Sequence, residues 1–267
     1  MKTVTSKDGA TIAFDQIGNG PLVVLVDSAL ADRMICAKLA TLLAKEFTVI
    51  NYDRRGRGDS TDTQPYAVER ELEDIEALID AAAGSAFIFG SSSGAALALE
   101  AASQLPSKIK KQILYEPPFI VDDSRVPLPN DFLEQVKALL AQGKRGDALK
   151  LFFSTAMGIP GIFIFMMRLM PSWSKSKSVV HTLPYDLAIM GDTQRGKPLS
   201  TSRWAAASMP TLVLTGGKSE AFFHKAGDAL AGVLPNAEHK ILKDQHHGSA
   251  VMSPNVVASE MIQFFKA

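Results

Sequence analysis

Short apolar segments alternate with helical patterns through the first 118 residues. Phe47–Tyr52, Ala86–Phe89 and Ile109–Tyr115 each predict a short strand. The unbroken apolar run Leu22–Val26 is typical of a strand buried on both faces of a parallel sheet. Val68–Ala83 carries apolar residues at helical spacing. This alternation predicts an α/β fold, with a mostly parallel central sheet and helices on both faces.

The strand signals stop after Pro117. From Phe119 to Trp204 the pattern predicts only helices, and a strand reappears at Thr211–Thr215. The candidate helices are Asn130–Gln142, Arg145–Met157, Ile162–Met170 and Lys175–Met190. We therefore expect a core domain formed by residues 1–118 and 205–267, with an all-helical cap inserted at residues 119–204.

Composition narrows the class of protein. The formal net charge of the 267 residues is zero, so nothing favours nucleic acid or an anionic membrane as a partner. The single cysteine excludes an intramolecular disulfide. No signal-like N-terminus and no apolar run of about 20 residues is present. We expect a soluble, cytoplasmic protein with no nucleic acid or membrane partner, and the oligomeric state stays open.

The segment Gly90–Gly94 reads Gly-Ser-Ser-Ser-Gly, a Gly-x-Ser-x-Gly pattern. A predicted strand precedes it and an alanine-rich helical segment follows. A nucleophile elbow requires both neighbours, whereas a flexible Gly/Ser loop, the alternative interpretation, requires neither. A nucleophile elbow strains its central residue and needs small neighbours, because the chain passes close to adjacent backbone. Ser92 would then project at a helix N-terminus, where N–H groups favour developing negative charge. We expect Ser92 to be the nucleophile.

With this elbow, the chain resembles the α/β-hydrolase superfamily over nearly all its length. The loop Tyr52–Ser60 is similar to that family's Asp-x-Arg-Gly-x-Gly-x-Ser loop, and it lacks the Gly-Lys-Ser/Thr ending of a phosphate-binding P-loop. The resemblance implies a structural role for this loop near the elbow. It therefore implies that Arg54, Arg55 and Arg57 are structural or solvated.

The resemblance also suggests the general base, which a serine nucleophile requires. Five histidines are present. His247 follows the last predicted strand and precedes Pro254 by seven residues, which is similar to the family's Gly-His loop. We predict that His247 is the base, with its neighbour His246 as the alternative.

The triad's acid departs from the family pattern. The family usually carries an Asp after the next-to-last strand, where this chain has Ser219, followed by Glu220. A second known place is the end of the strand after the elbow's helix, where this chain has Glu116. We predict Glu116 as the acid, because a glutamate at a strand end is more rigidly placed. Glu220, or no acid at all, are the alternatives.

The loop after the third strand would supply the oxyanion hole. By position in the family, the backbone N–H groups of Ala29 and Ser93 would form it. Asp27 is unusual there, because a nearby carboxylate would oppose a developing oxyanion. The simplest interpretation is that Asp27 hydrogen-bonds the loop backbone.

The cap is rich in large apolar residues. We expect most to pack the cap helices together and some to face Ser92, which predicts a mostly apolar pocket. They include Phe152, Phe153, Ile162, Phe163, Phe165, Met166, Met167, Met170 and Trp173.

These features predict a serine hydrolase that needs neither a metal nor another cofactor. Its expected substrate is a small or medium apolar ester, lactone or thioester. One alternative, suggested by the unusual Asp27, keeps the fold but changes the chemistry to perhydrolysis, haloperoxidase-type oxidation, C–C bond hydrolysis or cyclisation. Another is a non-catalytic receptor for a small apolar ligand, suggested by the missing Asp at Ser219.

Overall fold

An eight-stranded sheet forms the centre of the molecule, in the spatial order β1-β2-β4-β3-β5-β6-β7-β8. In a computed structural model that describes residues 1–267, strands β3 to β8 are parallel, while β2 pairs antiparallel with both β1 and β4. The predicted mostly parallel sheet is confirmed. The strands are β1 Lys2–Thr5, β2 Thr11–Ile17, β3 Leu22–Val26, β4 Thr48–Tyr52, β5 Ala86–Ser91, β6 Ile109–Tyr115, β7 Thr211–Gly216 and β8 Ala237–Leu242.

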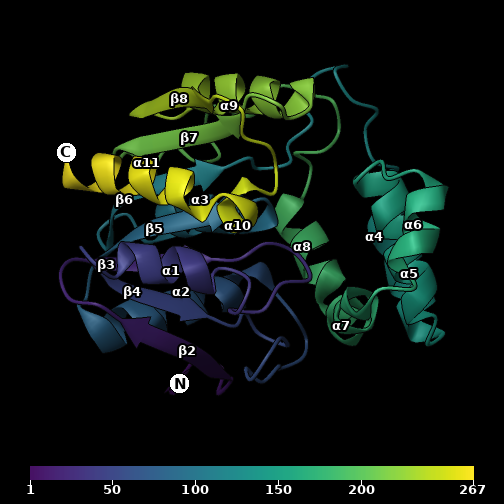
Figure 1. Ribbon diagram of the computed structural model, residues 1–267, viewed down its shortest axis with the longest axis horizontal. Helices are drawn as coiled ribbons and strands as arrows, with labels where there is room; N and C mark the ends of the chain where they lie inside the picture. The colour runs from purple at the N-terminus through teal and green to yellow at the C-terminus, as the bar shows by residue number, and fades with distance from the viewer.

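Helices cover both faces of this sheet, as the alternation predicts. Because successive strand residues point to opposite faces, Val24 joins one apolar core and its neighbours Val23 and Leu25 join the other. The first core includes α2 (Val68–Ala82), α3 (Ser93–Gln104) and α9 (Ala221–Val233), and the second includes α1 (Ala37–Leu43) and α11 (Pro254–Lys266). Figure 1 shows α1 and α11 side by side over one face. Both faces of the parallel strands are therefore buried.

Between β6 and β7 the chain forms only helices, here called the helical insertion. Figure 1 shows α4 to α7 as a separate group beyond the sheet, with α8 between that group and the core. The rings of Phe119 and Trp204 stack at 5.7 Å, so the two ends of the predicted cap lie together. The elements are α4 Phe132–Ala141, α5 Arg145–Leu151, a π-helical turn Phe152–Ala156, α6 Gly161–Met167, α7 Pro171–Val179, a 3₁₀ turn Val180–Thr182 and α8 Leu183–Met190.

The predicted helix Lys175–Met190 is divided into two. Its first part belongs to α7, and the 3₁₀ turn Val180–Thr182 separates that helix from α8. Pro184 is the second residue of α8. Proline there lacks the N–H that a continuous helix would need and is tolerated only in a first turn. A new helix therefore begins at this point, with its own direction.

Most apolar side chains of α6 face outward, which differs from the expectation that they pack within the cap or face the site. Ile162, Phe163, Phe165 and Met166 are exposed, and Ile164 is the buried residue of this helix. The helix is a short outer layer against the π-helical turn, so only one of its sides has a partner. No helix of the protein is both long and apolar enough to cross a membrane.

Candidate active site

Ser92 occupies a sharp turn between β5 and α3. Its φ is +55°, a left-handed conformation that is costly for a residue other than glycine. A Cβ atom at Gly90 would lie 2.2 Å from the Gly94 carbonyl oxygen, and one at Gly94 would lie 2.3 Å from the Val26 carbonyl oxygen. Both positions therefore require glycine. The local geometry is that of a nucleophile elbow.

Backbone strain gathers around this turn. Three of the four non-glycine residues with positive φ are Leu30, Ser92 and Glu116. Leu30 and Ser92 line the same cavity, and Glu116 lies directly behind it against His247. Such residues are held only where the surrounding structure fixes them, and they cluster at functional sites.

Glu116 follows β6 and its carboxylate is fully buried. Its Oε2 atom lies 2.8 Å from Nδ1 of His247, and its Oε1 atom accepts the Gly216 N–H at 2.6 Å. Because each carboxylate oxygen has its own partner, the side chain is fixed in orientation. The contact leaves Nε2 as the ring nitrogen that can accept a proton.

The loop that carries His247 is anchored on several sides. The Tyr115 hydroxyl donates to the His246 carbonyl oxygen at 2.7 Å. The ring of Phe223 stacks on the His247 imidazole at a centroid distance of 4.6 Å. The side chain of His246 instead accepts the Gly248 N–H at 3.1 Å. The structure thus brings His247, and not His246, to Glu116.

Glu220, the alternative acid, lies elsewhere on the edge of the cavity. It precedes α9 and pairs with Arg125 at 3.4 Å, with 64% of its side chain exposed. It makes no hydrogen bond to His247, whose carboxylate partner is Glu116.

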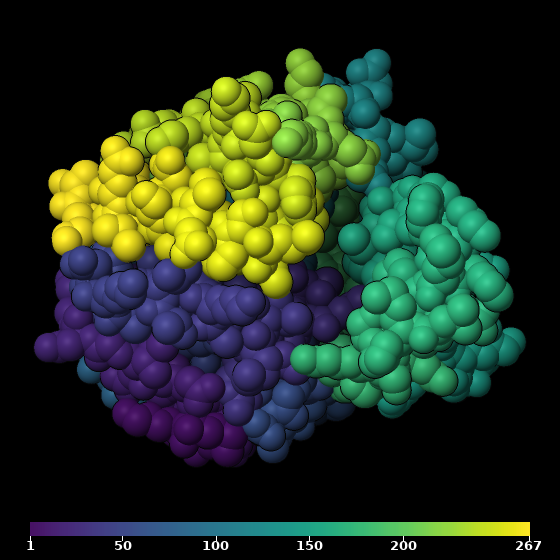
Figure 2. All heavy atoms as spheres, in the orientation of Figure 1, coloured from purple at the N-terminus to yellow at the C-terminus, as the bar shows by residue number.

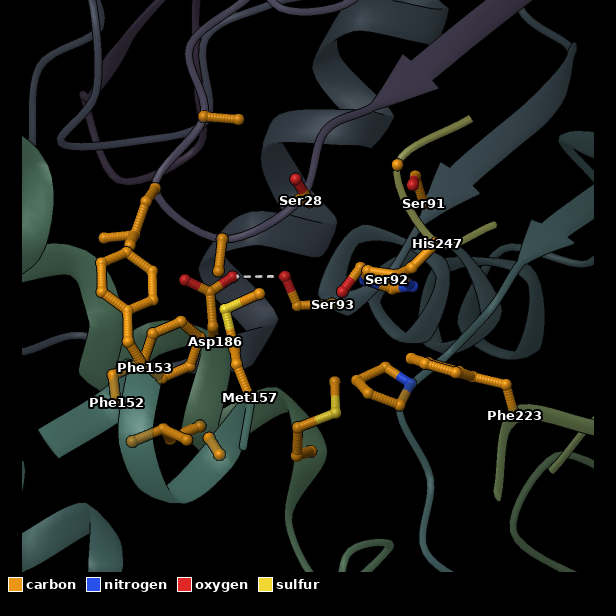
Figure 3. Close-up of a pocket in the computed structure, with 18 of the residues that line it drawn as sticks. Ser28, Ser91, Ser92, Ser93, Phe152, Phe153, Met157, Asp186, Phe223 and His247 are labelled. Carbon is orange, nitrogen blue, oxygen red and sulfur yellow. Dashed lines mark hydrogen bonds between the residues drawn. The ribbon is translucent and has the colours of Figure 1, made fainter. Parts of the chain in front are cut away.

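A cavity of about 460 Å³ lies between the core and the helical insertion. Figure 2 shows its opening as a recess between the insertion and the core. Of its 26 lining residues, 14 are hydrophobic, consistent with the predicted apolar pocket. Ser92, His247, Ala29 and Ser93 all line it, and Figure 3 shows Ser92 beside His247. No hydrogen bond joins the Ser92 hydroxyl to the His247 ring, and no cluster of side chains is placed to hold a metal ion.

Asp27 is placed differently from the simplest expectation. Its side chain is buried and does not line the cavity, and one of its oxygens lacks any hydrogen-bond partner. No loop N–H donates to it, and its polar neighbour is the Cys36 thiol. Burial raises its pKa to about 7, against the opposing effects of Cys36, Arg57 and Arg54. The expected backbone hydrogen bond is absent, and the carboxylate instead interacts with the Cys36 thiol at the N-cap of α1.

Sequence reasoning did not single out Asp186. This residue of α8 is buried beside the elbow, where it accepts hydrogen bonds from Ser93, Arg54 and Arg57. The arginines are fully buried in these ion pairs, in keeping with a structural role. One signal was present in the sequence: Asp186 is the single charge within the otherwise apolar segment Leu183–Met190.

Several known proteins are similar to this chain. A solved alpha/beta hydrolase of Sphaerobacter thermophilus DSM 20745 is 48% identical, with a TM-score of 0.90 over 99% of this chain and 100% of that one. The enol-lactonase of Burkholderia xenovorans LB400 is 21% identical, with a TM-score of 0.73 over 100% of both chains, a likeness of fold. An uncharacterized hydrolase of Bacillus subtilis (strain 168), YraK, is 30% identical over 149 residues. This chain spans about half the length of that relative, 54%.

A family model covers both the sheet and the site. The model of the alpha/beta hydrolase family matches residues 25–260, a range that includes the elbow, Glu116 and His247. The parallel strands and the strained serine between β5 and α3 agree with that match. The chain therefore belongs to the alpha/beta hydrolase family.

Proposed function

We propose that the protein is a cofactor-free serine hydrolase in which Ser92, His247 and Glu116 form the catalytic triad. The observation that supports this most is the 2.8 Å contact between Glu116 Oε2 and His247 Nδ1, in a cavity that Ser92 also lines. A buried carboxylate in this position holds the imidazole in one tautomer and stabilises the imidazolium that forms during reaction.

In the proposed mechanism, Ser92 Oγ attacks the substrate carbonyl carbon while Nε2 of His247 takes its proton. The tetrahedral oxyanion accepts hydrogen bonds from the N–H groups of Ala29 and Ser93. Collapse of this intermediate expels the leaving group, which receives the proton from His247. A water molecule, deprotonated by His247, then attacks the acyl-enzyme, and the proton returns to Ser92 as the acid is released.

The cavity supports a small or medium apolar substrate, such as an ester, lactone or thioester. Its volume of about 460 Å³ lies in the usual range of small-molecule sites. Phe152, Phe153 and Met157 of the helical insertion line the side facing Ser92 (Figure 3). These side chains favour an apolar acyl or alcohol group over a charged one.

Two observations weigh against the other functions considered. Asp27, which suggested perhydrolysis, C–C bond hydrolysis or cyclisation, is buried and does not line the cavity. A non-catalytic receptor was suggested by the missing Asp at Ser219, but the 2.8 Å contact of Glu116 with His247 supports a triad with a different acid.

The test is covalent labelling combined with turnover. A fluorophosphonate probe should label Ser92 in the wild-type protein, as read by peptide mass spectrometry, and p-nitrophenyl butyrate should be hydrolysed. Ser92→Ala should abolish both, while Ser107→Ala, on the exposed loop before β6, should change neither. Unchanged ester turnover in folded Ser92→Ala would overturn the proposal. A parallel screen with peroxide and diketone substrates distinguishes the alternative chemistries.

A further inference from the structure

Asp186 links the helical insertion to the nucleophile elbow. It lies on α8, and its carboxylate is almost completely buried. Its Oδ1 atom accepts the Ser93 hydroxyl at 2.8 Å (Figure 3) and Arg54 at 2.7 Å, while Oδ2 accepts Arg57 at 2.6 Å. One carboxylate of the insertion therefore contacts the residue next to Ser92 and two core arginines.

The same arginines reach the loop after β3. Arg57 Nη1 donates to the Ser28 carbonyl oxygen at 2.8 Å, and Arg54 Nη1 donates to the Asp27 carbonyl oxygen at 3.3 Å. The Ser28 carbonyl and the Ala29 N–H belong to one planar peptide group. Arg57 therefore fixes the direction of the Ala29 N–H. A charged donor on the carbonyl also polarises that peptide group and strengthens its N–H as a donor.

At the second proposed oxyanion donor, Ser93, the hydroxyl and the N–H have different partners. The hydroxyl is used by Asp186, and the N–H at the start of α3 stays available to the cavity that Ser93 lines. The hydrogen bond through the side chain restrains the first turn of α3. The two proposed oxyanion donors, Ala29 and Ser93, are thus tied to one carboxylate.

The charges in this buried cluster balance. Arg54 makes a bidentate pair with Glu71 at 2.7 Å, so two guanidiniums face two carboxylates, those of Glu71 and Asp186. Burial alone would raise the pKa of Asp186, but Arg57, Arg54 and the Ser93 hydroxyl bring it below its ordinary value. An ionised carboxylate only accepts hydrogen bonds. The Ser93 hydroxyl must therefore donate to it, which fixes its rotamer.

We propose that Asp186, acting with Arg57, positions the Ala29 and Ser93 N–H groups of the oxyanion hole, so that the seating of α8 on the core is a condition for hydrolysis. This inference rests on the proposed serine hydrolase function. Asp186 acts through the two peptide groups and is a positioning residue. The helical insertion then has a part in the chemical step as well as in covering the substrate.

Ser93→Ala is the decisive variant, because it removes the hydroxyl and keeps the N–H. We expect its kcat for p-nitrophenyl butyrate to fall roughly tenfold with KM nearly unchanged, because the lost orientation matters most in the transition state. Its Ki for a trifluoromethyl ketone, which forms a tetrahedral adduct, should rise by a similar factor. Asp186→Asn should lower kcat roughly 10²-fold, because misplacement of about 1 Å costs this much. When Ser93→Ala and Asp186→Asn are combined, the fall in kcat should be smaller than the product of the two single effects.

Two controls separate positioning from stability. Asp74→Asn breaks a similar buried pair, with Arg55 at 2.7 Å, away from the elbow, and should lower stability with kcat unchanged. Ser103→Ala makes the same substitution near the other end of α3 and should leave kcat and Ki unchanged. All kcat values are expressed per active site titrated with fluorophosphonate.

Two results would overturn this inference. One is an unchanged kcat and Ki in folded Ser93→Ala, and the other is a loss in Asp186→Asn no larger than that in Asp74→Asn. If Asp186→Asn does not fold, the kcat and Ki of Ser93→Ala alone test the inference. Failure of the proposed function is distinguishable, because Ser92→Ala would then retain turnover.

Discussion

Glu116 Oε2 lies 2.8 Å from Nδ1 of His247, while Glu116 Oε1 accepts the N–H of Gly216. The carboxylate thereby spans from the end of β6 to the end of β7 and to the histidine loop. Glu116 directly follows β6, and its carboxylate reaches the Gly216 N–H at the end of β7. Because Glu116 is fully buried directly after the end of β6, the histidine's partner is rigidly held beside the sheet.

The first prediction concerns this carboxylate. Glu116→Gln keeps the shape of the side chain but removes the charge that stabilises an imidazolium, and its amide can donate to Nδ1 and select the wrong tautomer. We expect kcat for p-nitrophenyl butyrate to fall by roughly 10³ to 10⁴. Glu220→Gln, as the matched control, should stay within about twofold of wild type because Glu220 contacts Arg125 and not His247. A larger loss in Glu220→Gln than in Glu116→Gln would contradict the assignment.

Asp27 predicts a pH dependence of stability. Burial raises its folded-state pKa to about 7 from the ordinary 3.8, so the folded state binds this proton more tightly than the unfolded state. Stability from this group is complete at low pH and is lost as pH rises from about 4 to about 7, by about 4 kcal/mol. Asp27→Asn should remove this pH-dependent contribution to the free energy of unfolding.

Urea denaturation of wild type and Asp27→Asn across this pH range measures the effect. The difference in unfolding free energy between them should shift in favour of the variant as pH rises. Asp123→Asn, on an exposed loop, should give a difference that is constant with pH. A constant difference for Asp27→Asn as well would show that folding does not raise the pKa of this carboxyl.

Gly94 and Gly232 predict opposite outcomes for the same substitution. A methyl group at Gly94 would lie 2.3 Å from the Val26 carbonyl oxygen, whereas one at Gly232, near the end of α9, meets nothing within 4 Å. We expect Gly94→Ala to destabilise the protein by several kcal/mol, at least about 3, because two backbone segments must separate. Gly232→Ala should stabilise it by about 0.5 to 1 kcal/mol. Thermal unfolding of both variants tests this prediction, and equal changes in their melting temperatures would refute it.

The elbow could be predicted from the sequence because its pattern is local. A strand, a five-residue turn and a helix follow one another in the chain, and Gly90 is required by its closeness to the Gly94 carbonyl oxygen within the turn. Only the need for glycine at position 94 comes from a distant part of the chain, the Val26 carbonyl oxygen of β3. Glu116 could be proposed because the family resemblance gives the end of the strand after the elbow's helix as a second place for the acid, and a glutamate at a strand end is rigidly placed.

The role of Asp186 could not be predicted in this way. It lies 93 residues from Ser93 in the chain, and their contact depends on how the helical insertion sits on the core. The exposure of α6 has the same origin: composition shows that Phe163 and Phe165 are apolar, but not which side of their helix has a partner. Asp27 differs in that its buried direction follows from side-chain rotation within a loop, which no periodic pattern specifies.

The last prediction concerns the size of the acyl group. Phe152 lines the cavity from the π-helical turn, so Phe152→Ala should enlarge the space facing Ser92. We expect the ratio of kcat/KM for p-nitrophenyl decanoate over butyrate to rise at least about tenfold, since a few methylene groups in an apolar pocket carry this much discrimination. Phe163→Ala removes an equal volume from α6, where 52% of the side chain is exposed, and should leave the ratio unchanged. An unchanged ratio in Phe152→Ala would mean that the acyl chain lies against other lining residues of the cavity, such as Met190 or Val251.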